Sequence, residues 1–171
     1  MTSNEQINVI KRNGRGKESL NIDKIHSMVG FATEGITGVS ASHVEMNSGL
    51  QFFDGISTDD IQQILIKSAN DLISLDNPNY QYVAARLLLF SLRKRLFHRL
   101  WEHPKFLDHI KLCIKKGMYD KDILVNYTEA EIDRLSGFID HERDYNFTYA
   151  GLRQVMDKYL VQDRSNGEIF E

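Results

Sequence analysis

Cysteine is almost absent from this 171-residue sequence, which contains a single one, Cys113. A disulfide framework, a multi-cysteine zinc site and a dithiol redox centre each need at least two cysteines. None of these can therefore be built within this chain. We expect Cys113 to be a small, buried apolar side chain.

Long hydrophobic runs are also missing, although 42% of the residues are hydrophobic and an ordinary core can form. The longest apolar stretch of note, residues 87–90, is far shorter than a membrane span. Residues 1–5 are polar and lack the basic and then apolar order of a signal peptide. We therefore expect a cytoplasmic protein without membrane contact.

Several other classes of site lack the residues that they need. The net charge is −3, so the protein as a whole does not attract nucleic acid. The stretch Gly14-Arg15-Gly16-Lys17 has neither the spacing of a Walker loop nor a Ser or Thr after its lysine. His141-Glu142 lacks the second histidine of a zincin, and the other histidines are irregularly spaced, so no metal site is expected.

The N-terminal segment, residues 9–25, is the most informative part of the sequence. An apolar strand leads into basic residues, Asn13-Gly14 is typical of a tight hairpin turn, and the return arm alternates apolar and polar residues. Asp23 is expected to cap the helix that follows, which places Lys24 where the helix dipole disfavours a cation unless an anion is bound. Basic hairpin side chains and the N–H groups of a helix start can meet at one anion. A nucleotide is a natural candidate.

The remaining pattern is helical. Helical periodicity and capping residues predict helices that begin near Asp23, Ser42, Ser57 or Thr58, Asn77-Pro78, Pro104, Thr128 and Thr148. Asn166-Gly167 then predicts a turn in a C-terminal β ribbon. An isolated two-stranded ribbon is only marginally stable in water, so we expect this sequence to be the front piece of a longer polypeptide. We predict a mainly α fold with a small β element (α+β), in which the N-terminal hairpin lids a helical bundle that further helices follow. The predicted domains are 1–102 and 103–171.

The second predicted helix is expected to open with a capping box from Ser42 to Glu45. It should bury Met46, Leu50 and Phe53 on one face and end at Asp54-Gly55. Near the end of the fourth predicted helix, the run Arg93-Lys94-Arg95 either binds nucleic acid or complements a helix C-terminus. We favour the helix C-terminus, and keep only Lys94 as a candidate binding residue.

Six blocks of the sequence resemble one family. Residues 9–24, 51–61 and 79–87 resemble the ATP cone of class I ribonucleotide reductase large subunits. Residues 117–120, 138–144 and 158–164 resemble the helical segment that follows the cone in the aerobic type of bacteria and phages. The resemblance covers essentially the whole chain, and its blocks occur in the family's order.

This resemblance implies a small helical bundle lidded by a short sheet, which binds ATP as activator or dATP as inhibitor, with Mg²⁺. Lys11 and Arg12 resemble the family's phosphate-binding pair, while Glu18 and Asn21 would face the base in a segment that continues to Lys24. Thr58 and Lys94 would complete the triphosphate site. Several cations together with helix N–H groups suit the concentrated charge of a triphosphate.

The sequence departs from the family pattern at two positions. Gln62 and Ser91 stand where inhibited members commonly have histidines around the sugar and phosphates. We therefore expect this cone to discriminate only weakly between ATP and dATP.

The resemblance also implies a parent enzyme, an oxidoreductase that converts ribonucleoside diphosphates to deoxyribonucleoside diphosphates for DNA synthesis. Its partners would be the rest of the large subunit, a radical-generating small subunit and, through the cone, further copies of itself. The family's chemistry needs a thiyl radical and a redox cysteine pair, so this segment alone carries no catalytic residue. Two alternatives stay open: a non-enzymatic helical adaptor whose basic hairpin binds protein or nucleic acid, and a degenerate cone that binds no nucleotide.

Overall fold

The computed structural model describes residues 7–11, 16–49, 51–98 and 102–171. The chain forms two compact units, unit 1 (residues 1–88 with 147–150) and unit 2 (residues 89–146 with 151–171). Helix α4 (Tyr80–Phe97) contributes its first half to unit 1 and its second half to unit 2. The division into domains at residues 102 and 103 stays a prediction.

Unit 1 contains a three-stranded sheet in the order β2-β1-β3. Strand β1 (Asn8–Ile10) pairs antiparallel with β2 (Lys17–Ser19), as the predicted hairpin requires, and parallel with β3 (Ile56–Ser57). The predicted turn at Asn13-Gly14 lies outside the described residues. Strand β3 was not predicted, because two residues are too few to show a strand pattern of their own.

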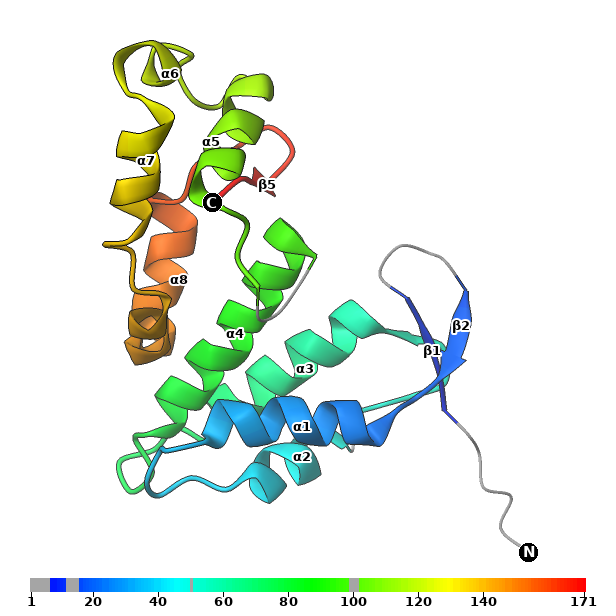
Figure 1. The fold of residues 1–171 in the computed structure, drawn as a ribbon. Helices are drawn as coiled ribbons and strands as arrows, with labels where there is room; N and C mark the ends of the chain where they lie inside the picture. The colour runs from blue at the N-terminus through cyan, green and yellow to red at the C-terminus, as the bar shows by residue number, and fades with distance from the viewer. Residues whose placement is uncertain (1–6, 12–15, 50, 99–101) are drawn as a thin grey trace, which may run out of the picture. The chain divides into compact units, whose positions relative to one another are not determined.

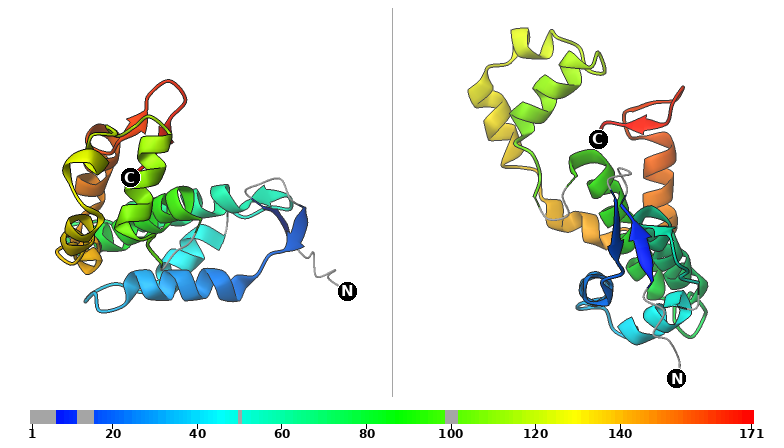
Figure 2. Two further views of the ribbon diagram at one scale, coloured as in Figure 1. Left: turned by 45° about the horizontal axis from the view of Figure 1, so that its top comes forward. Right: turned by 90° about the vertical axis from the view of Figure 1, so that its right-hand side faces the viewer.

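Three complete helices and the first half of α4 pack around the core of unit 1. They are α1 (Ile22–Thr33), α2 (Ala41–Gly49) and α3 (Thr58–Asp71). Helices α1 and α3 both begin beside the sheet (Figures 1 and 2). The apolar core of this unit includes Val9, Ile25, Val29, Ala32, Val44, Ile56, Ile61, Leu65, Ile66, Ala69, Tyr80, Val83, Ala84, Leu87 and Leu88. Of the inward positions that the helical period predicts for the third helix, Ile61, Leu65 and Ala69 are buried, whereas Ile73 is 37% exposed.

The start of α1 differs from the prediction. Asn21, not Asp23, is the N-cap, and its side-chain oxygen accepts a hydrogen bond of 3.0 Å from the backbone N–H of Lys24. Asp23 lies inside the first turn, where its negative charge interacts favourably with the positive end of the helix dipole. Asn and Asp are both good caps, so composition alone does not decide between neighbouring candidates.

The bounds of α2 also differ. The helix begins at Ala41, so Ser42 lies inside it and is not the N-cap. It ends at Gly49, which leaves Asp54 and Gly55 in the connection to β3.

The predicted inward face of α2 was wrong. Met46 is 72% exposed and Phe53 is 60% exposed, while Val44 and Ser48 are the buried residues of the helix. Ser48 satisfies its hydroxyl within the helix by donating to the carbonyl of Glu45, at 2.9 Å. A serine paired in this way can be buried, which a hydrophobic pattern does not reveal. Leu50 lies outside the described residues.

Unit 2 consists of the second half of α4 and a series of short elements. They are α5 (Phe106–Lys115), α6 (Ile123–Asn126), α7 (Glu129–Ser136), the 3-10 helix η1 (His141–Asn146), α8 (Tyr149–Lys158), β4 (Gln162–Asp163) and β5 (Glu168–Ile169). The capping box at Thr128 is confirmed, as is the burial of Cys113, which is 1% exposed. The two shortest helical elements, α6 and η1, were not predicted.

Arg93 corrects the interpretation of the basic run on α4. Its side chain does not simply complement the helix C-terminus. It is 4% exposed and donates to the Asp144 carboxylate at 3.0 Å and to the Tyr145 hydroxyl at 2.8 Å. Lys94 and Arg95 do lie in the last turn of the helix. Arg93 is therefore a buried tie within unit 2.

Two kinds of feature are absent from the described residues. No helix in this part of the chain has both the length and the apolar character that crossing a bilayer requires. Among the same residues, no group of three or more histidine, cysteine, aspartate or glutamate side chains is placed to hold a metal ion.

Candidate functional site

The inner face of the sheet positions the first basic residue. Successive side chains of a strand point to opposite faces, so Lys11 shares a face with Val9, which is 3% exposed, and not with Ile10. Glu18 lies directly across from Val9 in the pairing of β1 with β2 and so shares this face too. The Lys11 ammonium and a Glu18 carboxylate oxygen are 2.9 Å apart.

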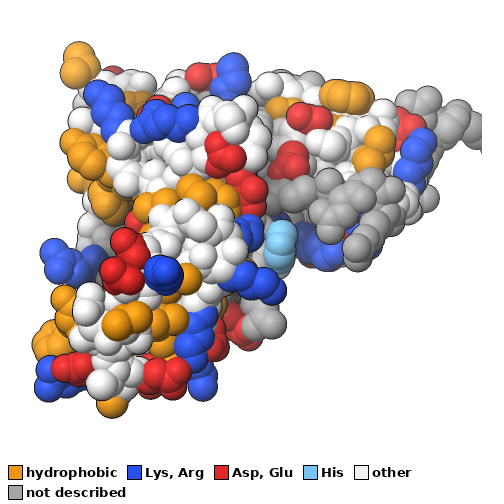
Figure 3. Space-filling model, turned by 90° about the horizontal axis from the view of Figure 1, so that it is seen from above, with side chains coloured by type: hydrophobic (Ala, Val, Ile, Leu, Met, Phe, Trp, Pro, Cys, Tyr) orange, Lys and Arg blue, Asp and Glu red, His pale blue; other side chains and the backbone are white. Residues whose placement is uncertain are grey.

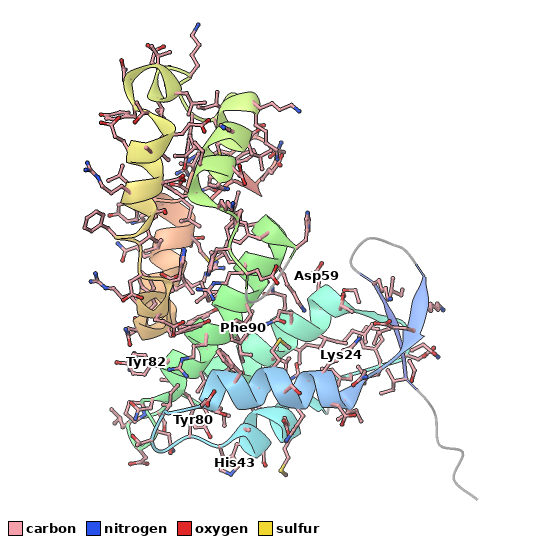
Figure 4. The ribbon with its side chains drawn as sticks, viewed as in Figure 1. Lys24, His43, Asp59, Tyr80, Tyr82 and Phe90 are labelled. Atoms are coloured by element: carbon pink, nitrogen blue, oxygen red, sulfur yellow. The ribbon has the colours of Figure 1, made fainter. Side chains whose placement is uncertain are left out.

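The start of α1 brings a second cation to the same carboxylate. The Asn21 cap fixes the first turn, and from this turn the Lys24 ammonium lies 4.0 Å from the other oxygen of Glu18. Figure 4 shows Lys24 at the end of α1 that adjoins the sheet, and Asp59 at the corresponding end of α3. Two lysines from different elements therefore share one carboxylate.

The electrostatics of Glu18 reflect this arrangement. The hydrogen bond from Lys11 holds the pKa of the Glu18 carboxyl below its ordinary value, and the charges of Lys11 and Lys24 act in the same direction, against the opposing effect of burial. An anion is thus stabilised at the place where the two ammonium groups meet.

The start of α3 lies beside Lys11. Ile10 is in register with Ser57 in the parallel pairing of β1 with β3, so the residues that follow them, Lys11 and Thr58, leave the two strands at the same edge of the sheet. Ser57 is the N-cap of α3, and its hydroxyl accepts from the backbone N–H of Asp60 at 3.0 Å. The exposed N–H groups of a helix start carry partial positive charge, so this edge favours anions.

The predicted site residues divide into three groups. Lys11 and Lys24 each form an ion pair with Glu18, and Asn21 and Thr58 belong to the starts of α1 and α3. Arg12 lies outside the described residues. Lys94 is a half-buried residue of unit 2. The sequence analysis did not find the contact of Asp54 with Asn8 of β1, because it depends on a strand pairing that was not predicted.

The family of the chain follows from a sequence comparison. The sequence model of the ATP cone domain matches residues 7–95, which include the three-stranded sheet, helices α1 to α3 and most of α4. The chain belongs to the ATP cone family. An ATP cone implies the binding of a nucleotide effector.

Similar proteins extend the match beyond the cone. The chain is 47% identical over 168 residues to the ribonucleoside-diphosphate reductase subunit alpha of Haemophilus influenzae and 48% identical over 168 residues to ribonucleoside-diphosphate reductase 1 subunit alpha of Escherichia coli. It is 44% identical over 165 residues to the subunit alpha of Enterobacteria phage T4. These matches cover 96% to 98% of the chain and 22% of each relative, so the chain spans about a fifth of their length.

Gln62 and Ser91, which are predicted to depart from the family pattern, are both buried. Gln62 in α3 is 2% exposed, and its side-chain amide donates to the carbonyl of Leu87 at 2.9 Å. Ser91 in α4 is 4% exposed and belongs to unit 2. In this cone, the polar group at position 62 ties two helices together.

Proposed function

We propose that this chain is the allosteric N-terminal region of a ribonucleotide reductase large subunit, and that its cone binds the triphosphate of ATP at the edge of the sheet. The observation that carries the proposal is the meeting of Lys11 and Lys24 at the Glu18 carboxylate. Two cations already gather around one anionic group, and the starts of α1 and α3 adjoin them. A phosphate group carries charge of the same sign as a carboxylate and has more acceptor oxygens.

Each predicted residue has a role in this proposal. Lys11 and Lys24 bind phosphate oxygens. At the start of α3, the Thr58 hydroxyl and the backbone N–H groups bind the same triphosphate. Asn21 caps α1 with its oxygen, which leaves its amide nitrogen for the adenine base, and Glu18 turns from the lysines toward the base when phosphate takes its place. Arg12 and Lys94 stay predicted phosphate-binding residues.

Mg²⁺ fits this proposal as a companion of the triphosphate. It is usually bound by substrate phosphates together with one or two carboxylates, and seldom by a cage made of protein alone. Asp59 and Asp60 lie in the first turn of α3, so this helix start offers carboxylates next to Thr58. When bound, Mg²⁺ would offset part of the phosphate charge.

The whole polypeptide, in this proposal, reduces ribonucleoside diphosphates to deoxyribonucleoside diphosphates for DNA synthesis in the cytoplasm. The similarity to reductase alpha subunits over 96% to 98% of the chain supports it. The partners would be the rest of the large subunit, a radical-generating small subunit and further copies that associate through the cone. With Cys113 as its single cysteine, the chain itself contributes regulation and not the redox chemistry.

The adaptor alternative is less well supported. Among the described residues on the face drawn in Figure 3, basic and acidic side chains are interspersed. A protein that binds nucleic acid through its charge needs a basic patch or stripe. The family match likewise favours a nucleotide over a macromolecular partner.

A ligand titration tests the proposal. ATP with Mg²⁺ at about a hundred times its Kd should stabilise the fold by about 2.7 kcal/mol and raise the melting temperature. Isothermal calorimetry should give saturable binding with one site per chain. No thermal shift at millimolar ATP together with tight binding of RNA or DNA would establish the adaptor, and no response to either ligand would establish a degenerate cone.

Two variants assign the site. Lys11→Ala and Lys24→Ala should each weaken ATP binding about tenfold, since each removes a charged hydrogen-bond donor to phosphate. Lys67→Ala is the matched control, because Lys67 is an exposed lysine of α3 that pairs with Asp71 at 2.9 Å near the other end of the helix. Equal losses in all three variants would mean that general charge, and not this site, binds ATP.

A further inference from the structure

The connection between α2 and β3 contains an acidic residue with an unusual set of contacts. One oxygen of Asp54, Oδ1, accepts two hydrogen bonds from Asn8, one from the backbone N–H at 2.8 Å and one from the side-chain amide at 2.9 Å. These hydrogen bonds hold the pKa of Asp54 below its ordinary value, the backbone one contributing most. The carboxylate is therefore fixed on the first residue of β1.

The next residue completes the attachment. Gly55 donates its backbone N–H to the carbonyl of Asn8 at 2.8 Å, so both backbone groups of Asn8 are bound by residues 54 and 55. Gly55 has a φ of 83°, a left-handed conformation that glycine adopts without strain. The chain can thus turn at Gly55 directly from the Asp54 contact into strand β3.

This attachment is continuous with the register of the sheet. Residues 54 and 55 are bound to Asn8, Ile56 pairs with Val9, and Ser57 pairs with Ile10. Lys11 and Thr58 are the residues that follow this last pair. Strand β3 has only two residues and lies at the edge of the sheet, so its own ladder holds the register weakly. A slip of one residue would move Thr58 by about 3.3 Å relative to Lys11.

We propose that Asp54 is a positioning residue for the nucleotide site: by clamping Asn8 it sets the register of β3 on β1 and so holds the start of α3 beside Lys11. This inference rests on the proposed function, because it concerns the same triphosphate site. Asp54 does not touch the ligand. It acts through the distance between Thr58 and Lys11.

Substitutions at Asp54 test this inference by calorimetry with ATP and Mg²⁺. Asp54→Ala should weaken ATP binding roughly fivefold to tenfold, since two hydrogen bonds to a charged acceptor are lost. Asp54→Asn should stay within about twofold of the wild type, because both donors of Asn8 converge on Oδ1 and an amide retains that oxygen. If Asp54→Ala does not fold, Asp54→Ser serves in its place, because a hydroxyl is too short to accept both donors.

A double-mutant cycle separates positioning from general destabilisation. In a Lys11→Ala background the effect of Asp54→Ala should shrink to less than about twofold, since the distance between Thr58 and Lys11 then no longer matters. An undiminished effect in that background would overturn the inference, as would wild-type affinity in Asp54→Ala. Failure of the wild-type protein to bind ATP would instead overturn the proposed function.

Discussion

The side-chain amide of Gln62 and the main-chain carbonyl of Leu87 form a buried hydrogen bond of 2.9 Å between α3 and α4. Gln62 is 2% exposed, and one N–H of its side-chain amide is bound to Leu87 inside unit 1. A histidine at this position would have a different shape and a different hydrogen-bonding pattern. Gln62, one of the two residues predicted to depart from the family pattern, thus has a structural role that the sequence does not suggest.

Gln62→Glu should destabilise unit 1 strongly at neutral pH. A carboxylate at this buried position has no proton to donate to the Leu87 carbonyl, and burial of the charge should cost about 3 kcal/mol. The pKa of the new carboxyl should be raised by burial, so the loss should diminish as the pH falls and the protonated group donates to Leu87. Urea denaturation at several pH values measures the effect.

Two other variants calibrate this measurement. Gln62→Leu keeps the volume without a charge and should cost about 1 kcal/mol, the net value of a typical hydrogen bond. Gln63→Glu places the same charge on the exposed neighbouring residue and should have little effect. Similar losses in Gln62→Glu and Gln63→Glu would contradict the importance of the buried tie.

ATP and dATP should bind this cone with affinities within about threefold of each other. The two ligands differ by one hydroxyl, and strong discrimination requires a polar group placed to hydrogen-bond it or a pocket that rejects it. In this chain Gln62 is committed to Leu87, and Ser91 is a buried residue of unit 2. Calorimetry with both nucleotides on one preparation measures the ratio, and a large preference for dATP would contradict the expectation.

Glu18→Gln should tighten the binding of inorganic tripolyphosphate severalfold at low salt. The Glu18 carboxylate competes with phosphate for Lys11 and Lys24, and an amide removes that competition. Tripolyphosphate isolates this effect, since it has no base for Glu18 to contact. Asp23→Asn is the matched control because it removes one negative charge from the first turn of α1. Equal tightening in both variants would indicate long-range charge and not the shared carboxylate.

The same ion pairs predict a pH dependence of the nucleotide-free protein. The pKa of Glu18 is lowered from 4.5, so the folded state favours its charged form. This contribution to stability is present above the ordinary carboxyl pKa and is lost as the pH falls through the lowered value. Wild type and Glu18→Gln should therefore converge in melting temperature on acidification, which a pH series of thermal melts measures. A constant difference across the series would contradict the ion pairs.

Arg93→Met should destabilise unit 2 by about 2 kcal/mol. The substitution leaves Asp144 and Tyr145 without the guanidinium that binds both, and Asp144 is partly exposed, so water offsets part of the loss. Arg95→Met, at an exposed position of the same helix, is the control and should change stability by less than about 0.5 kcal/mol. Both are measured by urea denaturation, and equal stability of the two variants would show that Arg93 is not a structural tie.

The sequence by itself determined the elements whose signals are local. The Asn13-Gly14 turn signal between an apolar strand and an alternating return arm predicted the hairpin. The helical period predicted α3 and α4, and Thr128 with Glu131 predicted a capping box. Each signal lies within a few residues and depends on backbone geometry that repeats along the chain. The family resemblance, which the cone match confirmed, came from blocks of the same kind.

Only the tertiary structure decided which residues meet. Strand β3 forms because it pairs with β1, and the adjoining hydrogen bond joins Asp54 to Asn8, 46 residues away in sequence. No local sequence pattern encodes that pairing. The burial of Gln62 and the exposure of Met46 likewise depend on which surfaces the neighbouring helices cover. The convergence of Lys11 and Lys24 on Glu18 is of this second kind, since it needs the sheet and α1 to be in place together.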